Sequence, residues 1–136
     1  MNLRRACLVV VLVALLGATL ACGGEVSVST AKVADAYMST DEGGNDRTTV
    51  YAQDAIFYAQ VDLQNAPDDT VLKAVWTVVN AQDTDPGFII NETEYTTGSD
   101  LIYFTLSNPD LWPIGTYKVE IYLDGELVNT INFSVQ

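Results

Sequence analysis

The sequence predicts an all-β domain, a seven-stranded antiparallel β-sandwich that follows an N-terminal export segment. Three observations predict this fold. Hydrophobic and polar residues alternate with a period of two in seven segments, as in strands with one buried face. Clusters of Gly, Pro, Asn and Asp separate these segments at a spacing typical of sandwiches. After the export segment, no stretch long enough to form a helix has the 3.6-residue period of an amphipathic helix. A small closed β-barrel is the alternative architecture.

Residues 1–21 have the pattern of a signal peptide. Arg4 and Arg5 give a basic start, and the 16 residues from Ala6 to Ala21 contain no charge. A membrane-spanning helix needs about 20 apolar residues, whereas the core of a signal peptide is shorter and ends in small residues. We therefore expect residues 1–21 to be removed on export.

A cysteine stands directly after this segment. The stretch Ala18–Gly24 (ATLACGG) resembles the bacterial lipobox, whose Cys becomes the lipidated first residue of the mature protein. Thr19 and Leu20 depart from the usual pattern, which has Leu and then a small residue at these places. The resemblance implies a covalent lipid on Cys22, attachment to the membrane through that lipid, and a short tether over residues 22–30. Because Cys7 leaves with the signal peptide, Cys22 has no disulfide partner.

The first three predicted strands lie between residues 33 and 79. Val33–Met38 precedes a loop rich in Gly and Asp over Ser39–Arg47. Ile56–Gln64 and Val71–Val79 both alternate, and the second of them places Trp76 in the core. The inward residues of these two strands are Phe57, Ala59, Val61 and Leu63, then Leu72, Ala74, Trp76 and Val78.

Four further strands are predicted over Phe88–Thr97, Leu101–Leu106, Tyr117–Leu123 and Leu127–Val135. Between the last two, the dipeptide Asp124-Gly125 is a strong hairpin signal, because a type I′ turn needs positive φ at both central residues. The inward residues of the last strand are expected to be Leu127, Ile131, Phe133 and Val135.

The C-terminal half resembles a known class of domain. Trp76 and Tyr117 stand where immunoglobulin-like domains have their core tryptophan and tyrosine corner. The stretch Trp112–Gly125 (WPIGTYKVEIYLDG) resembles the final hairpin of immunoglobulin-like and fibronectin type III-like domains in exported bacterial lipoproteins. This resemblance covers Ile56–Val135 and implies a fold and an exported location, but no activity. We expect one such domain over residues 31–136.

Charge and composition exclude several functions. The chain has no His, 18 acidic and 6 basic residues, and a net charge of −12, which becomes −14 without Arg4 and Arg5. Nucleic acid is not an expected partner, because phosphate binding needs a basic surface. A His-dependent triad or metal site is excluded. Two carboxylates in the middle of predicted strands, Asp62 and Glu120, fall on solvent faces rather than in an apolar pocket. We therefore expect a protein that is not an enzyme.

The acidic loop after the first strand is the candidate metal site. Asp41, Glu42, Asn45 and Asp46 supply oxygen ligands of the kind that Ca²⁺ prefers. Their order is not that of an EF-hand, and a flexible acidic loop without a metal is the alternative. No other cofactor is expected.

Three aromatic residues are candidates for contact with a partner. Trp112 lies in a predicted loop before Pro113, while Tyr58 and Tyr122 fall on predicted outer faces. Exposed aromatic side chains favour binding of protein or sugar. For Trp112 the alternative is a cap over the end of the sandwich.

These features together predict a lipid-anchored, non-enzymatic lipoprotein of the cell envelope that acts as a binding or structural module. It would face the periplasm or the cell exterior and contact an envelope protein or a glycan. The alternatives are a carbohydrate-binding module that uses its exposed aromatics, and a calcium-stabilised accessory domain of an envelope complex. The sequence leaves the oligomeric state open.

Overall fold

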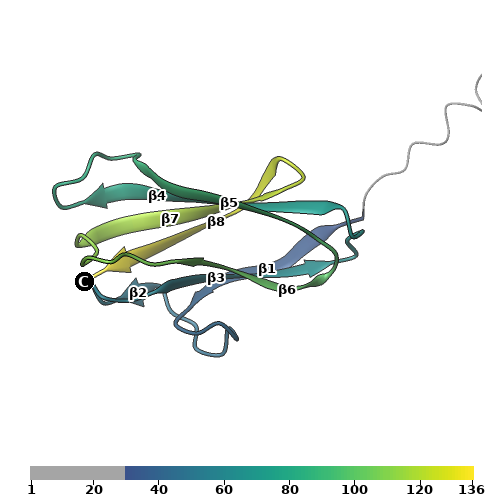
Figure 1. Cartoon of the computed structure of the whole chain (residues 1–136), viewed down its shortest axis with the longest axis horizontal. Helices are drawn as coiled ribbons and strands as arrows, with labels where there is room; N and C mark the ends of the chain where they lie inside the picture. Colours follow the sequence, from purple (N-terminus) through teal and green to yellow (C-terminus); the bar gives the residue numbers. More distant parts are fainter. Residues whose placement is uncertain (1–29) are drawn as a thin grey trace, which may run out of the picture.

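Two β-sheets pack face to face in the computed structural model, which describes residues 30–136 (Figure 1). The predicted signal peptide, Cys22 and most of the predicted tether lie outside the described residues. The strands, in chain order, are β1 (Lys32–Ser39), β2 (Val50–Tyr51), β3 (Phe57–Gln64), β4 (Thr70–Ala81), β5 (Ile89–Thr97), β6 (Asp100–Leu106), β7 (Gly115–Leu123) and β8 (Glu126–Val135).

The smaller sheet has three strands in the order β1-β3-β6, and the larger has five in the order β2-β8-β7-β4-β5. All pairs are antiparallel except β2–β8. Two open sheets with their own edge strands form a sandwich rather than a closed barrel, which confirms the predicted fold class.

Each of the seven predicted strands is present, with ends that differ by one or two residues. The strand that the sequence did not predict is β2, whose two residues pair in parallel with Ser134 and Val135. A strand of two residues is too short to show an alternating pattern. The predicted hairpin is confirmed, since Asp124 and Gly125 have φ values of 47° and 85°.

The core lies between the two inner faces and follows the predicted alternation in β3, β4, β6 and β7. Trp76 is fully buried, as predicted. The prediction for Leu127 was wrong, because this side chain is 46% exposed. The register of the β7–β8 pair shifts between Ile121 and Tyr122, and Tyr122 pairs with Leu127. Because of this shift, Leu127 is out of phase with the inward residues that follow it in β8.

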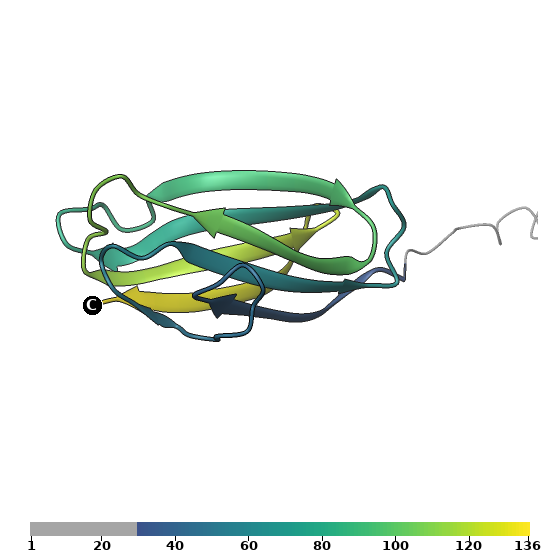
Figure 2. The same ribbon diagram turned by 60° about the horizontal axis from the view of Figure 1, so that its bottom comes forward.

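The sandwich has two ends that differ in their loops (Figures 1 and 2). We call the end that holds Thr30 the near end; it has the β3–β4 and β5–β6 turns and the β7–β8 hairpin. The opposite, far end has the β4–β5 loop, the β6–β7 loop and the C-terminus. No helix in residues 30–136 is long and apolar enough to cross a membrane.

Candidate functional site

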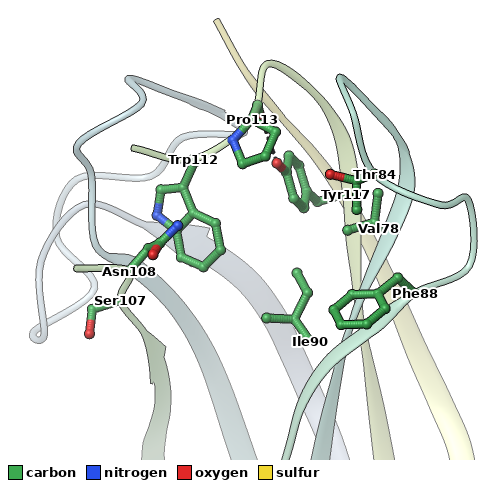
Figure 3. A pocket seen from close by; sticks show the side chains of 9 residues that line it. All are labelled: Val78, Thr84, Phe88, Ile90, Ser107, Asn108, Trp112, Pro113 and Tyr117. Atoms are coloured by element: carbon green, nitrogen blue, oxygen red, sulfur yellow. Dashed lines mark hydrogen bonds between the residues drawn. The ribbon is translucent and has the colours of Figure 1, made fainter. Parts of the chain in front are cut away.

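An apolar pocket of about 270 Å³ opens at the far end of the sandwich (Figure 3). The β6–β7 loop forms one side, and the end of β4 with the start of β5 forms the other. Phe88 and Ile90 face Trp112 across the pocket, while Tyr117 and Pro113 stand at its top in Figure 3. The lining residues are Val78, Thr84, Phe88, Ile90, Ser107, Asn108, Trp112, Pro113 and Tyr117.

Trp112 forms a wall of this pocket and is not the exposed side chain that a binding role was expected to need. It is only 5% exposed, and its ring stacks on Phe57 with centroids 4.6 Å apart. Its indole Nε1–H donates a hydrogen bond to the Ala55 carbonyl at 2.9 Å, and its backbone N–H donates to the Gln53 carbonyl at 2.8 Å. Trp112 therefore caps the end of the sandwich, the alternative that the sequence left open.

Tyr117 forms the adjacent wall and is held by a similar contact. Its hydroxyl donates a hydrogen bond to the Pro113 carbonyl, four residues earlier. Burial removes water from the phenol and raises the pKa of Tyr117 above its usual value. The bond ties the β6–β7 loop to the core, so this side of the pocket is rigidly supported.

Tyr58 and Tyr122 do not join Trp112 in one surface. Tyr58 lies on the outer face of the smaller sheet and contacts Tyr103 edge to face, with ring centroids 6.0 Å apart. Tyr122 lies on the outer face of the larger sheet, with Lys73 Nζ 4.6 Å from its ring centroid. Both are half-buried. The three predicted binding aromatics therefore occupy three separate places.

Tyr122 borders a second, shallower hollow of about 720 Å³ on the outer face of the larger sheet. Its floor includes Val75 and Thr77, both 6% exposed although the alternation predicts an outward face. Its rim includes Lys118 and Glu120, which form an ion pair at 3.2 Å. This hollow offers polar groups of both signs around a small apolar floor.

The acidic loop is held by its own backbone. Asp41 Oδ1 accepts a hydrogen bond from the Asp46 N–H at 2.9 Å, and Oδ2 accepts from the Asn45 N–H at 3.1 Å. Both bonds lower the pKa of Asp41, and the bond from Asp46 has the larger effect. Gln60 Nε2 donates a hydrogen bond to the Glu42 backbone carbonyl at 2.9 Å. Within residues 30–136 there is no group of three Asp, Glu, His or Cys side chains arranged to hold a metal ion. The Asp41 carboxylate therefore holds the loop in its conformation through hydrogen bonds to the loop backbone.

Gln60 is a buried polar residue, although it alternates with the inward residues of β3 and so points to the outer face of the sheet. It is 0% exposed, because the loop after β1 folds over it. Its Nε2 lies within 3.1 Å of Ser39 Oγ and the carbonyls of Asp41 and Glu42. The alternation of β3 correctly points Gln60 away from the core, but no local pattern shows that a distant loop covers that face.

The far end also carries exposed apolar residues that the sequence analysis did not assign. Phe88 is 55% exposed, Ile89 53%, Leu111 62% and Ile114 39%. They lie at the same end because the start of β5 and the start of β7 both pair with the end of β4, although Ile89 lines the hollow on the outer face and not the pocket. A signal for them was present, since Leu111–Ile114 (LWPI) is an apolar run inside a predicted loop.

Comparisons with known proteins agree on the fold. No family model matches the chain, and no curated protein matches it in sequence. An immunoglobulin-like protein of Pseudomonas aeruginosa (PA1606) has a similar structure, with a TM-score of 0.54 at 14% identity over 81% of this chain and 100% of that one. The alkylpurine DNA glycosylase AlkC of Pseudomonas fluorescens matches with a TM-score of 0.53 at 15% identity over 79% of this chain.

A β-glucosidase of Listeria innocua matches with a TM-score of 0.50 at 13% identity over 81% of this chain. The chain spans only 31% of the glycosylase and 17% of the β-glucosidase, so the likeness is to one part of each. At these identities the shared property is the fold alone. The described residues therefore form an immunoglobulin-like β-sandwich.

Proposed function

We propose that this protein is a non-enzymatic binding module of the cell envelope, anchored to a membrane by lipid on Cys22, which presents the far end of its sandwich to an envelope protein. The observation that carries the proposal is the position of the pocket. Thr30, where the described chain begins, hydrogen-bonds to the Asn65 carbonyl at the near end. The pocket lies at the opposite end, because its lining residues belong to the β4–β5 and β6–β7 connections and the strands beside them. A protein anchored through residues before Thr30 would hold the pocket away from the membrane.

The sequence supports the anchor. The uncharged stretch from Ala6 to Ala21 precedes Cys22 and the pair Gly23-Gly24. Residues 23–29 then separate Cys22 from the first described residue, enough extended chain to span about 20 Å. Such a tether would let the sandwich stand clear of lipid head groups. Whether the domain faces the periplasm or the exterior does not change this geometry.

Metabolic labelling with radioactive palmitate tests the anchor. We expect label on the wild-type chain and none on Cys22→Ala. Cys7→Ala is the matched control, because Cys7 lies in the segment expected to be removed, and it should retain the label. Equal labelling of wild type and Cys22→Ala would refute the lipid anchor, as would loss of label from Cys7→Ala alone.

A carbohydrate-binding role is a second candidate, favoured by the hollow beside Tyr122. Its polar rim and apolar floor suit a neutral sugar, which needs hydroxyl partners and a flat contact. Trp112 is buried and is no longer part of this candidate. A glycan array compared between wild type and Tyr122→Ala tests it. Binding that survives Tyr122→Ala would exclude this hollow.

A further inference from the structure

We propose that the far-end pocket receives one apolar, preferably aromatic, side chain from a partner protein whose neighbouring residues are Lys or Arg. This inference rests on the binding function proposed above and names the site and the chemistry of the partner. It draws on the size of the pocket, the charge around it and the rigidity of its walls.

The size of the pocket selects a single side chain. Its volume of about 270 Å³ is below the 300–1,000 Å³ typical of sites for whole small-molecule ligands. The walls are mostly apolar, with Phe88 on one side and Trp112 and Tyr117 on the other. Aromatic rings pack favourably in offset or edge-to-face contacts with such walls. Leu111 and Ile114, which flank the lining residues Trp112 and Pro113 in the sequence, add exposed apolar surface at this end, of the kind that marks contact sites.

The loops at this end are acidic. Asp83 and Asp85 lie in the β4–β5 loop, Asp110 lies in the β6–β7 loop, and Asp54 lies in the segment that bonds to Trp112. These three segments contain no Lys or Arg, since the basic residues in the described part of the chain are Lys32, Arg47, Lys73 and Lys118. The residues that line the pocket carry no charge, but the loops on both sides of it contain these carboxylates. Such a surface attracts a basic segment and steers its approach.

The same charges disfavour the other occupants of an exposed apolar surface. A second copy of this chain would bring another set of carboxylates to the mouth, and like charges at an interface are costly. The anionic head groups of a membrane would be repelled in the same way. A basic protein segment is therefore the occupant that satisfies both the apolar walls and the acidic border.

The walls are held in place without a ligand. Trp112 is fixed by Ala55 and Gln53, as described above, and Tyr117 by Pro113. On the opposite side, the Phe88 carbonyl accepts a hydrogen bond from the Val78 N–H at 2.9 Å. A preformed site loses little conformational entropy on binding. Asn108 Nδ2 has only a long bond of 3.5 Å to the Leu111 carbonyl, so it is available to donate to the backbone of an incoming segment.

The test uses the full chain in a non-ionic detergent and three synthetic pentapeptides, followed by amide chemical shifts in NMR titrations. The first peptide is Lys-Lys-Phe-Lys-Lys, the second replaces Phe by Gly, and the third replaces every Lys by Glu. We expect the first peptide to shift the amides of the pocket residues and to bind at least tenfold more tightly than either of the others. Equal binding of the Gly peptide, or no shift at the pocket up to millimolar peptide, would overturn the proposal.

Two pairs of variants locate the site. Ser107→Trp, which places a large ring at a residue that lines the pocket, should weaken the first peptide at least tenfold, whereas Thr105→Trp, on the outer face of β6, should not. Replacing Asp83, Asp85 and Asp110 by Lys should also weaken it at least tenfold. The control variant replaces three near-end carboxylates by Lys and should change binding less than threefold; these are Asp68, Asp69 and Asp100. A similar loss in both members of either pair would refute the site, provided that circular dichroism shows all variants folded.

A neutral oligosaccharide added in a fourth titration tests whether the far-end pocket accepts a sugar in place of the apolar side chain. Shifts at the pocket that exceed those of the Phe peptide would overturn the inference in favour of sugar. Failure of the peptide experiments leaves the palmitate result unaffected, and loss of the palmitate label leaves the pocket unaffected. The proposed anchor and the proposed docking site therefore fail separately.

Discussion

The two halves of the core are built from different side chains. The half toward the far end is aromatic: Phe57 contacts the rings of Tyr51, Trp76, Trp112, Tyr117 and Phe133, with centroids between 4.6 and 6.3 Å apart. The half toward the near end is aliphatic, with Leu63, Leu72 and Ile121 at 1% exposure or less.

The loops explain this difference. At the near end, two-residue turns join β5 to β6 and β7 to β8, so the strands themselves close the core. At the far end, the β4–β5 and β6–β7 connections are seven and eight residues long, from 82 to 88 and from 107 to 114. The β6–β7 connection carries Trp112, whose ring stacks on Phe57 and so joins the aromatic half of the core. Residues of both connections line the pocket.

Removing the central ring should cause the largest loss of stability. Phe57→Ala is expected to lower the free energy of unfolding by about 3–5 kcal/mol, the cost of deleting a buried Phe. Leu63→Ala is the comparison in the aliphatic half and should cost about 1 kcal/mol less, because aromatic pairs add about 0.5–1.5 kcal/mol beyond their buried area. Urea unfolding measures both. A greater loss for Leu63→Ala would contradict the idea that the aromatic half dominates stability.

Two glycines test how tightly each end is closed. A Cβ on Gly115 would lie 2.3 Å from the Asn80 carbonyl oxygen and 2.5 Å from Ala81 Cα, both backbone atoms that cannot turn away. Gly115→Ala should therefore cost about 1–3 kcal/mol or more. At the near end, a Cβ on Gly98 would meet Asp68 Oδ1 at 2.6 Å, and that side chain is free to move.

Gly98→Ala should accordingly change stability by less than about 0.5 kcal/mol. Thermal unfolding of the two variants gives the comparison directly. Equal shifts in melting temperature would mean that the far end accommodates an added Cβ as easily as the near end. The close approach of β7 to β4 at Gly115 would then not limit stability.

A side-chain hydrogen bond at the near end should have a smaller effect on the free energy of unfolding. The Asp124 carboxylate accepts a hydrogen bond from the Val71 N–H at 2.9 Å, which ties the β7–β8 hairpin to β4. Asp124→Ala should cost about 1 kcal/mol in denaturant unfolding, a typical value for one hydrogen bond. Asp124→Asn keeps an acceptor and tolerates positive φ, so it should recover most of the loss. An Asn variant as unstable as the Ala variant would assign the effect to the charge.

The smallest effect is expected in the loop after β1, which is held by Asp41 rather than by the core. Its pKa is lowered from 3.8 because the Asp46 and Asn45 N–H groups stabilise the carboxylate. A lowered pKa means that the stabilisation is complete above pH 3.8 and is lost as the pH falls through the folded-state value.

In an NMR titration, the Asn45 and Asp46 amide signals should therefore move only below pH 3.8, while the amides of β4 and β7 stay fixed. Asp41→Asn should abolish this step. Titration of Asp41 at or above its ordinary pKa would show that the hydrogen bonds do not hold the loop in solution.

The sequence alone determined seven of the eight strands and the class of fold. Alternation in Ile56–Gln64 and Val71–Val79 is a local property, because successive side chains of a strand point to opposite faces wherever the strand lies. The Asp124-Gly125 turn was equally local. The same reasoning found Trp76, whose neighbours in β4 place it on the inner face.

Only the tertiary structure decided which residues meet at the far end. Trp112 is buried because Gln53 and Ala55, almost sixty residues earlier, receive its hydrogen bonds, and Gln60 is buried because a separate loop covers it. Phe88 and Trp112 line one pocket because the connections that carry them meet at the same end of the sandwich. These contacts depend on pairing between distant segments, which no periodicity within a single segment encodes.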